Sequence, residues 1–165
     1  MRIIQTILIL LMTIMCFGQD KIIGIYSDRF SESIELKADS TFIHNYRFDL
    51  SSSWTVGKWK FSNDTLYLKT ELVLDTLYTI TVENKITKDS LVLSSDLKPN
   101  RIDIQEYALN SISGGGQNRV KPPNKLYYKR KRLYRINENR TLDLRKLKAF
   151  WSDKKYKTYF TKETE

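Results

Sequence analysis

Residues 53–68 read SWTVGKWKFSNDTLYL, and the alternation of their apolar residues changes phase halfway. Trp54 and Val56 share one parity, whereas Trp59 has the other. Period-two alternation is typical of a β-strand with one buried face. Gly57 lies between the halves, and a bulge, which inserts one residue and often contains glycine, reverses the facing of all that follows. We therefore predict a bulge at Gly57, with both tryptophans facing the interior of a strongly bent sheet, as core or as the lining of a site.

The same alternation recurs along most of the chain and predicts a mainly β fold. It is found in residues 33–37, 42–48, 65–69, 78–82 and 101–105, and no helical spacing precedes residue 140. Four Asp-Ser or Asp-Thr pairs separate such segments: Asp39-Ser40, Asp64-Thr65, Asp75-Thr76 and Asp89-Ser90. Aspartate tolerates turn geometry and accepts backbone hydrogen bonds, so each pair predicts a turn between antiparallel strands.

Residues 108–124 interrupt this pattern with three consecutive glycines and Pro122-Pro123. They predict a flexible surface loop, with a mobile lid or a linker as the alternatives. Residues 125–165 then predict a strand, a turn at 137–140 after a second strand, a short C-terminal helix and a last strand. The helix is indicated by the spacing of Leu144, Leu147, Phe150 and Trp151, and the last strand by the alternation of Tyr156, Thr158 and Phe160.

The N-terminus has the pattern of a secretory signal. Arg2 precedes an apolar run from Ile3 to Met15, which is shorter than the roughly 20 residues that a membrane-spanning helix needs. We expect residues 1–18 to be a signal peptide cut after Gly18, and residues 19–165 to form one domain, exported to the periplasm or secreted, with no transmembrane span. The alternatives are a retained N-terminal helix and a lipid-modified Cys16 in an outer-membrane lipoprotein, for which Met15 is a poor neighbour. Removal of residues 1–18 leaves a chain without cysteine, which excludes disulfides and thiolate chemistry.

The formal charge of +9 is concentrated in the last third of the chain. From Gln117 to Glu165 there are 16 lysines and arginines against 5 acidic residues, a net of +11, whereas residues 20–116 carry a net of −3. The densest cations are Lys129, Arg130, Lys131, Arg132 and Arg135. They predict a patch for an anionic envelope lipid, glycan or protein, or cations that only protect a sheet edge. Because we expect export, we expect no nucleic-acid partner.

Several short motifs resemble one family. They are Gly24-Ile25-Tyr26, Leu36-Lys37-Ala38-Asp39-Ser40-Thr41-Phe42, Gly57-Lys58-Trp59, Asp64-Thr65-Leu66-Tyr67-Leu68 and Ile86-Thr87-Lys88-Asp89-Ser90-Leu91-Val92-Leu93. Over about residues 24–94 the chain resembles the lipocalin-like domains of small exported bacterial proteins, although Ser40 replaces the usual glycine of a hairpin. The resemblance implies an antiparallel up-and-down meander that closes into a barrel or half-barrel. It supplies no catalytic residue.

The residues offer little catalytic chemistry. His44 is the only histidine, and the three glycines are not followed by the lysine of a phosphate-binding loop. We therefore expect neither an enzyme, nor a metal site, nor a cofactor. The aromatic residues on one face of the alternating segments instead predict a barrel interior that binds a small apolar ligand. The predicted lining is Phe42, His44, Tyr46, Phe48, Trp54 and Trp59. The four Asp-Ser/Thr pairs also resemble a bacterial O-glycan acceptor pattern, with Ser40, Thr65, Thr76 and Ser90 as the acceptors.

Two functions follow from these observations. The first is a non-catalytic exported binding protein that encloses a small apolar ligand in its barrel. The second is a surface-association protein that binds an anionic envelope component through the basic C-terminal region. A hollow barrel favours the first, whereas a packed interior with a contiguous basic face favours the second.

Overall fold

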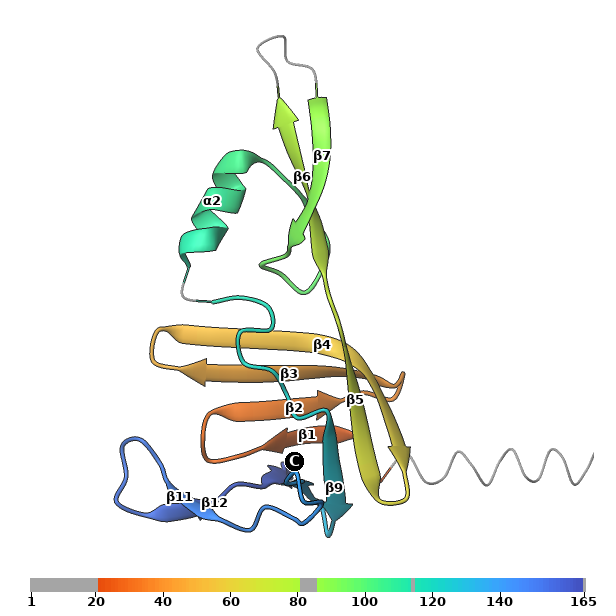
Figure 1. Ribbon diagram of the computed structural model, residues 1–165, viewed down its shortest axis with the longest axis vertical. Coiled ribbons are helices and arrows are strands. Elements are labelled where there is room, and N and C mark those ends of the chain that lie inside the picture. The colour runs from red at the N-terminus through yellow and green to blue at the C-terminus, as the bar shows by residue number, and fades with distance from the viewer. Residues whose placement is uncertain (1–20, 81–85, 114, 165) are drawn as a thin grey trace, which may run out of the picture.

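A closed antiparallel β-barrel is the centre of the molecule (Figure 1). The computed structural model describes residues 21–80, 86–113 and 115–164. The barrel strands are β1 (Gly24–Ser27), β2 (Glu32–Leu36), β3 (Thr41–Phe48), β4 (Ser51–Ser62), β5 (Thr65–Glu71), β9 (Lys125–Lys129), β10 (Arg132–Arg135) and β13 (Phe160–Lys162). Each pairs with the barrel strand that follows it in the chain, and β13 pairs with β1, so the predicted mainly β, antiparallel barrel is confirmed. The basic C-terminal third supplies three of its strands.

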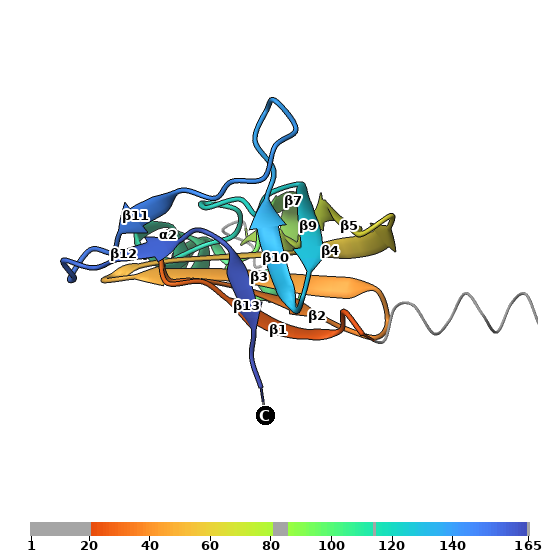
Figure 2. The ribbon, with the colours of Figure 1, turned by 90° about the horizontal axis from the view of Figure 1, so that it is seen from below.

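The remaining helix and strands lie in two insertions between barrel strands. Between β5 and β9 the chain forms the sheet β7-β6-β8 and one helix, from β6 (Leu74–Ile80), β7 (Ile86–Leu93), β8 (Arg101–Ile102) and α2 (Ile104–Ile112). Between β10 and β13 it forms a hairpin of β11 (Lys146–Lys148) and β12 (Lys155–Lys157). The first insertion stands on one side of the barrel and the hairpin extends from another (Figures 1 and 2). Among the described residues no helix is long and apolar enough to cross a membrane.

The predicted bulge at Gly57 is wrong. The register of β4 is unbroken on both sides, with Phe42 opposite Gly57 on β3 and Thr70 opposite Gly57 on β5. Residues 53, 55, 57 and 59 face the interior, whereas Trp54 lies on the outer face and donates from Nε1 to the carbonyl oxygen of Ser95 at 3.2 Å. The inward positions before Trp59 are serine, threonine and glycine, so apolar character does not mark the buried face there.

Close packing explains the glycine at this position. A Cβ atom on Gly57 would overlap the backbone carbonyl of Lys69 and would lie 2.9 Å from Cε1 of Phe42. The glycine therefore lets β5 and the Phe42 ring approach the β4 backbone, which is the second common reason for glycine within a strand.

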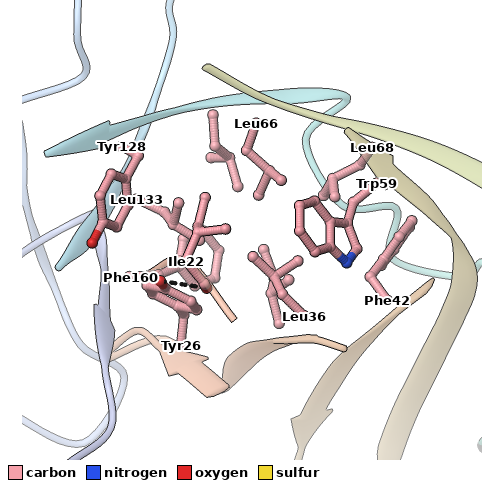
Figure 3. Close-up of a cluster of buried hydrophobic side chains, with 12 residues drawn as sticks. Ile22, Tyr26, Leu36, Phe42, Trp59, Leu66, Leu68, Tyr128, Leu133 and Phe160 are labelled. Atoms are coloured by element: carbon pink, nitrogen blue, oxygen red, sulfur yellow. Dashed lines mark hydrogen bonds between the residues drawn. The ribbon is translucent and has the colours of Figure 1, made fainter. Parts of the chain in front are cut away.

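Twelve side chains fill the barrel interior and converge from all parts of the chain (Figure 3). They are Ile22, Tyr26, Ile34, Leu36, Phe42, Trp59, Leu66, Leu68, Leu126, Tyr128, Leu133 and Phe160. Their polar atoms are satisfied: the hydroxyl of Tyr26 donates to the carbonyl of Ile22 at 2.7 Å, and Nε1 of Trp59 donates to the carbonyl of Lys37 at 3.0 Å. Burial of this apolar surface is the main favourable contribution to the stability of a barrel without disulfides.

Both helix predictions need correction. Residues 104–112, expected as strand and loop, form α2, which begins because the Asp103 side chain accepts hydrogen bonds from the backbone N–H groups of Gln105 and Glu106. No C-terminal helix forms at 144–151, because residues 146–148 pair with residues 155–157 as a β-hairpin. The single last strand predicted around residues 156–160 is correspondingly two strands, β12 and β13. The predicted turn at 137–140 is confirmed, with Arg140 donating from N to the carbonyl of Asn137 at 2.9 Å.

Only two of the four Asp-Ser/Thr pairs form turns. Ser40 and Asp64 have φ of 64° and 55° in the β2–β3 and β4–β5 connections. The pairs at 75–76 and 89–90 instead lie within β6 and β7, which are hydrogen-bonded to each other. The buried carboxylate of Asp75 is satisfied there by the backbone N–H of Asn100 at 2.7 Å, so it restrains a neighbouring loop without making a turn of its own.

Candidate functional site

The six residues predicted to enclose a ligand do not share a cavity. Three of them, Phe42, His44 and Trp59, are buried within the barrel. Tyr46 and Phe48 continue the same face of β3 but are only half-buried, at the open end of the barrel. Trp54 points outward from β4 towards residues 94–95. The sequence thus placed the aromatic face of β3 correctly and that of β4 incorrectly.

A cluster of charged side chains lies at one end of the barrel interior, beside His44. Glu32 accepts a hydrogen bond from Nη2 of Arg135 at 2.9 Å and lies 3.0 Å from Nε2 of His44. The same guanidinium nitrogen lies 3.6 Å from Oδ2 of Asp28. Arg135 therefore points into the barrel and does not belong to the predicted anionic-partner patch. The guanidinium of Arg135 thus faces both carboxylates, whereas Oδ2 of Asp28 and Nδ1 of His44 are buried without a hydrogen-bond partner among the described residues.

The environments of the two carboxylates differ. Burial raises the pKa of Asp28, although hydrogen bonds from the backbone N–H groups of Glu32 and Phe30 oppose the shift. Burial also acts to raise the pKa of Glu32, but the hydrogen bond with His44 and the charge of Arg135 outweigh it, and the pKa is lowered. His44 is 0% exposed, so it is inaccessible to a substrate from outside. The cluster links β2, β3 and β10 through side chains that are largely shielded from solvent. In the described parts of the chain, no three His, Cys, Asp or Glu side chains form a group that could hold a metal ion.

Above this cluster the β11–β12 hairpin covers part of the open end and leaves a hollow of about 680 Å³. Its aromatic lining comes from Phe30, Tyr46, Phe48, Phe150, Trp151 and Tyr156, and its cations are Arg29, Arg47 and Lys148. The rings of Phe48 and Phe150 meet edge to face with centroids 4.6 Å apart, and Phe150 meets Trp151 in the same way at 4.9 Å. We call Phe48, Phe150 and Trp151 the aromatic tip.

Cations line a row of hollows that continues from the hairpin along β13. A hollow of about 780 Å³ shares Arg29 and Tyr156 with the first one, and two further hollows share Lys131 and Lys162. We call these cations the basic face: Lys21, Arg29, Lys129, Arg130, Lys131, Lys146, Lys155, Lys157 and Lys162. The carboxylates among the same lining residues are Asp28, Asp64 and Glu163. The surface along the C-terminal strands is therefore strongly positive.

Backbone carbonyls, and not carboxylates, hold two cations of this face. Nζ of Lys157 donates to the carbonyl of Leu144 at 2.8 Å, and Nζ of Lys162 donates to the carbonyl of Lys21 at 3.3 Å. Such contacts position an ammonium group without neutralising it. Its field remains available to an anion in solution.

The turn between β9 and β10 presents the predicted cationic run. Arg130 and Lys131 occupy its two central positions with φ of 50° and 61°, while Lys129 and Arg132 are opposite each other. This turn type favours Asn-Gly, because side chains with a Cβ are strained at positive φ by about 1 kcal/mol or more each. The guanidinium of Arg132 lies 4.8 Å from the ring centre of Tyr159, a favourable cation–π distance. Four of the five predicted patch residues are thus together, at the barrel end away from Arg135.

The four candidate glycan acceptors are scattered. Ser40 and Thr65 are half-buried in or beside turns, Thr76 is half-buried within β6, and Ser90 is exposed on β7. The hydroxyl of Thr65 already donates to the carbonyl of Asn63 at 3.3 Å. Modification at these positions stays a prediction.

The sequence pointed to the cations but missed the aromatic tip. Phe150 and Trp151 were assigned to a short C-terminal helix because of their spacing from Leu144 and Leu147, whereas both are exposed residues of the turn between β11 and β12. Two adjacent large aromatic residues within a lysine-rich segment are the signal that identifies them in retrospect. The N-terminal signal and lipidation predictions lie outside the described residues.

Comparisons with known proteins supply no further assignment. No family model, curated protein or solved structure matches the chain.

Proposed function

We propose that the protein is a non-catalytic binding protein that associates with an anionic component of the cell envelope through the basic face. The observation that carries this proposal is the continuity of the cation-lined hollows from the β11–β12 hairpin to the β9–β10 turn. Opposite charge on a partner would be attracted along the whole face, and such attraction raises the rate of encounter.

The filling of the barrel favours this function over an enclosed apolar ligand. The side chains of Phe42, Trp59 and ten other residues occupy the space that a ligand would need. Proteins pack such interiors densely, and a ligand would have to displace them at a cost in stability. Binding on the outside requires no such rearrangement.

The strain in the β9–β10 turn adds a second argument. Asparagine and glycine would relieve the strain at Arg130 and Lys131, yet the turn carries two cations. Strain that is retained at a surface position is often associated with function. Here the turn gains an exposed concentration of positive charge.

Export and a lipocalin-like family membership are parts of the same proposal. The N-terminal sequence pattern supports an exported bacterial protein, and the closed eight-stranded barrel in next-neighbour order supports the resemblance. In an exported protein, the partners available to the basic face would be anionic lipid, acidic glycan and acidic protein.

A binding panel with two matched variants tests this function. The face variant carries Lys131→Gln, Lys155→Gln, Lys157→Gln and Lys162→Gln, and the control variant carries Lys58→Gln, Lys60→Gln, Lys69→Gln and Lys98→Gln. Both lose four charges, all of them on half-buried or exposed side chains. The wild type and the control should bind phosphatidylglycerol vesicles, polygalacturonate or polyglutamate, and the face variant should bind the same material about a hundred-fold more weakly. Equal losses in the two variants would assign binding to net charge alone, and no binding to any of these materials would refute the proposed function.

A further inference from the structure

The aromatic tip is an exposed apolar cluster on a protruding hairpin. Trp151 is 89% exposed and Phe150 is 69% exposed, both in the turn between β11 and β12. Phe48, at the end of β3, supports Phe150 from the barrel side. Figure 2 shows the hairpin extending outward beside the end of β3. Large aromatic side chains exposed together are uncommon on a free surface and mark a site of interaction.

Cations surround the aromatic tip. Arg29, Arg47 and Lys148 line the hollow beneath it, and Lys154 and Lys155 follow in the hairpin. Two carboxylates are also present: Asp49 lines the hollow, and Asp153 pairs with Lys148 at 2.6 Å. Five cations against two carboxylates leave the surroundings of the rings positive. An apolar partner with negative charge around its point of contact would be complementary.

The ring geometry distinguishes between the available partners. Phe150 makes angles of 74° with Phe48 and 79° with Trp151, so no two neighbouring rings present a common plane. The three rings therefore form no extended flat platform on which consecutive sugar rings could stack, whereas a compact wedge suits hydrocarbon. Tryptophan prefers the boundary between headgroups and acyl chains, and lysine and arginine beside it attract anionic headgroups.

We infer that the aromatic tip inserts into the interface of an anionic lipid bilayer, with Trp151 and Phe150 among the acyl-chain ends and the surrounding cations at the headgroups. This inference rests on the proposed function and specifies its partner. The basic face supplies the long-range attraction, and the tip supplies the short-range apolar contact. Two weak contributions of this kind are what stable attachment of a peripheral protein to a membrane requires.

Tryptophan fluorescence with brominated lipid tests the insertion. Bromine in the acyl chains quenches a tryptophan only at close range, and Trp59 is a buried internal reference at 4% exposure. The wild type is mixed with equimolar phosphatidylcholine and phosphatidylglycerol vesicles, with and without brominated chains. We expect quenching in the wild type and its loss in Trp151→Phe. Because Trp151 is almost fully exposed, this substitution should leave the fold intact.

A matched pair of double variants measures the contribution of the tip to affinity. Phe150→Ala with Trp151→Ala should weaken vesicle binding about ten-fold or more, because two buried rings are lost from the lipid. The control is Leu109→Ala with Ile112→Ala on α2, which removes apolar side chains of similar exposure away from the basic face and should have no effect.

The outcomes separate the two proposals. Vesicle binding without tryptophan quenching, or binding only to polygalacturonate or polyglutamate, would overturn the insertion and leave the association with anions standing. Equal losses in the two double variants would also overturn it, since apolar surface in general would then be responsible. Failure to bind any anionic material would overturn the proposed function itself.

Discussion

Arg135 on β10 donates a hydrogen bond to Glu32 on β2 across 103 positions of sequence, with 2.9 Å between Nη2 and Oε1. The contact ties the basic C-terminal third to the first hairpin of the barrel. It also separates Arg135 from the cations of the basic face, which line hollows on the outer surface. One arginine of the cationic run is therefore structural, and its loss should affect stability more than binding.

We predict that Arg135→Met lowers the free energy of unfolding by about 2–3 kcal/mol, because the carboxylates of Glu32 and Asp28 lose their buried partner. The value is below the roughly 3–5 kcal/mol typical of fully buried pairs, since the Arg135 side chain is 27% exposed. Urea denaturation measures it. Lys129→Met, on the exposed side of the neighbouring strand, should change the free energy by less than about 0.5 kcal/mol. Similar effects of the two substitutions would contradict a structural role for Arg135.

The close approach at Gly57 gives a second prediction. Gly57→Ala should destabilise the barrel by about 1–3 kcal/mol, because the new methyl group meets the Lys69 backbone and the Phe42 ring. At Gly115 a Cβ would meet only the hydroxyl of Ser52 at 2.5 Å, and a side-chain oxygen can rotate away. Gly115→Ala should therefore cost less in the same denaturation experiment. A neutral Gly57→Ala would mean that β5 lies farther from β4 than described.

Asp143 gives the pH dependence of stability a predictable sign. Its carboxylate accepts hydrogen bonds from the Arg145 side chain at 2.9 Å, which lowers the pKa from the ordinary 3.8 to about 2. The carboxylate thus stabilises the fold fully above pH 3.8, and this contribution is lost as the pH falls through about 2. Thermal unfolding should show a deficit for Asp143→Asn at neutral pH that shrinks towards pH 2. The same substitution at Asp153, which is fully exposed, should show no such deficit. A constant gap for Asp143→Asn would refute the linkage.

Relief of the strained turn should separate stability from binding. Replacing Arg130 by Asn and Lys131 by Gly installs the residues that this turn type prefers. The free energy of unfolding should rise by about 1 kcal/mol, while affinity for phosphatidylglycerol vesicles should fall because two cations are lost. Unchanged affinity would show that the cations of this turn do not contribute to binding. An unchanged free energy of unfolding would show that the turn is not strained.

Sequence alternation identified the strands wherever the inward positions are apolar, as in β3 and β5. It failed on β4, because Ser53, Thr55 and Gly57 face inward and leave Trp54 as the more conspicuous residue on the outside. Helix α2 was missed because the alternation of Ile102 and Ile104 was taken for a strand that continues past Asp103, the residue that caps the helix. The local sequence pattern cannot show which segments will pack against a strand. The neighbours of β4 decide why residue 57 must be glycine and why Trp59 is buried while Trp54 lies on the outer face.

The candidate site was predicted only in composition. The uneven charge identified the basic C-terminal third, and the structure presents Lys129, Arg130, Lys131 and Arg132 in and beside the β9–β10 turn. The assignment of Arg135 to this patch was wrong, because alternation along β10 directs it inward beside Leu133. The approach of Phe150 to Phe48 depends on the fold of an insertion. No pairing signal links the two segments in a single sequence.

Hydrogen–deuterium exchange with and without phosphatidylglycerol vesicles tests most directly whether binding occurs on the outer basic face. The account predicts slower exchange at the β9–β10 turn, residues 130–131, and at the hairpin turn, residues 149–154, when vesicles are present. Exchange in β3 and β4, which enclose Phe42 and His44, should be unchanged because the barrel interior is already filled. Protection confined to β3 and β4, with none at the two turns, would contradict the account and favour a ligand inside the barrel.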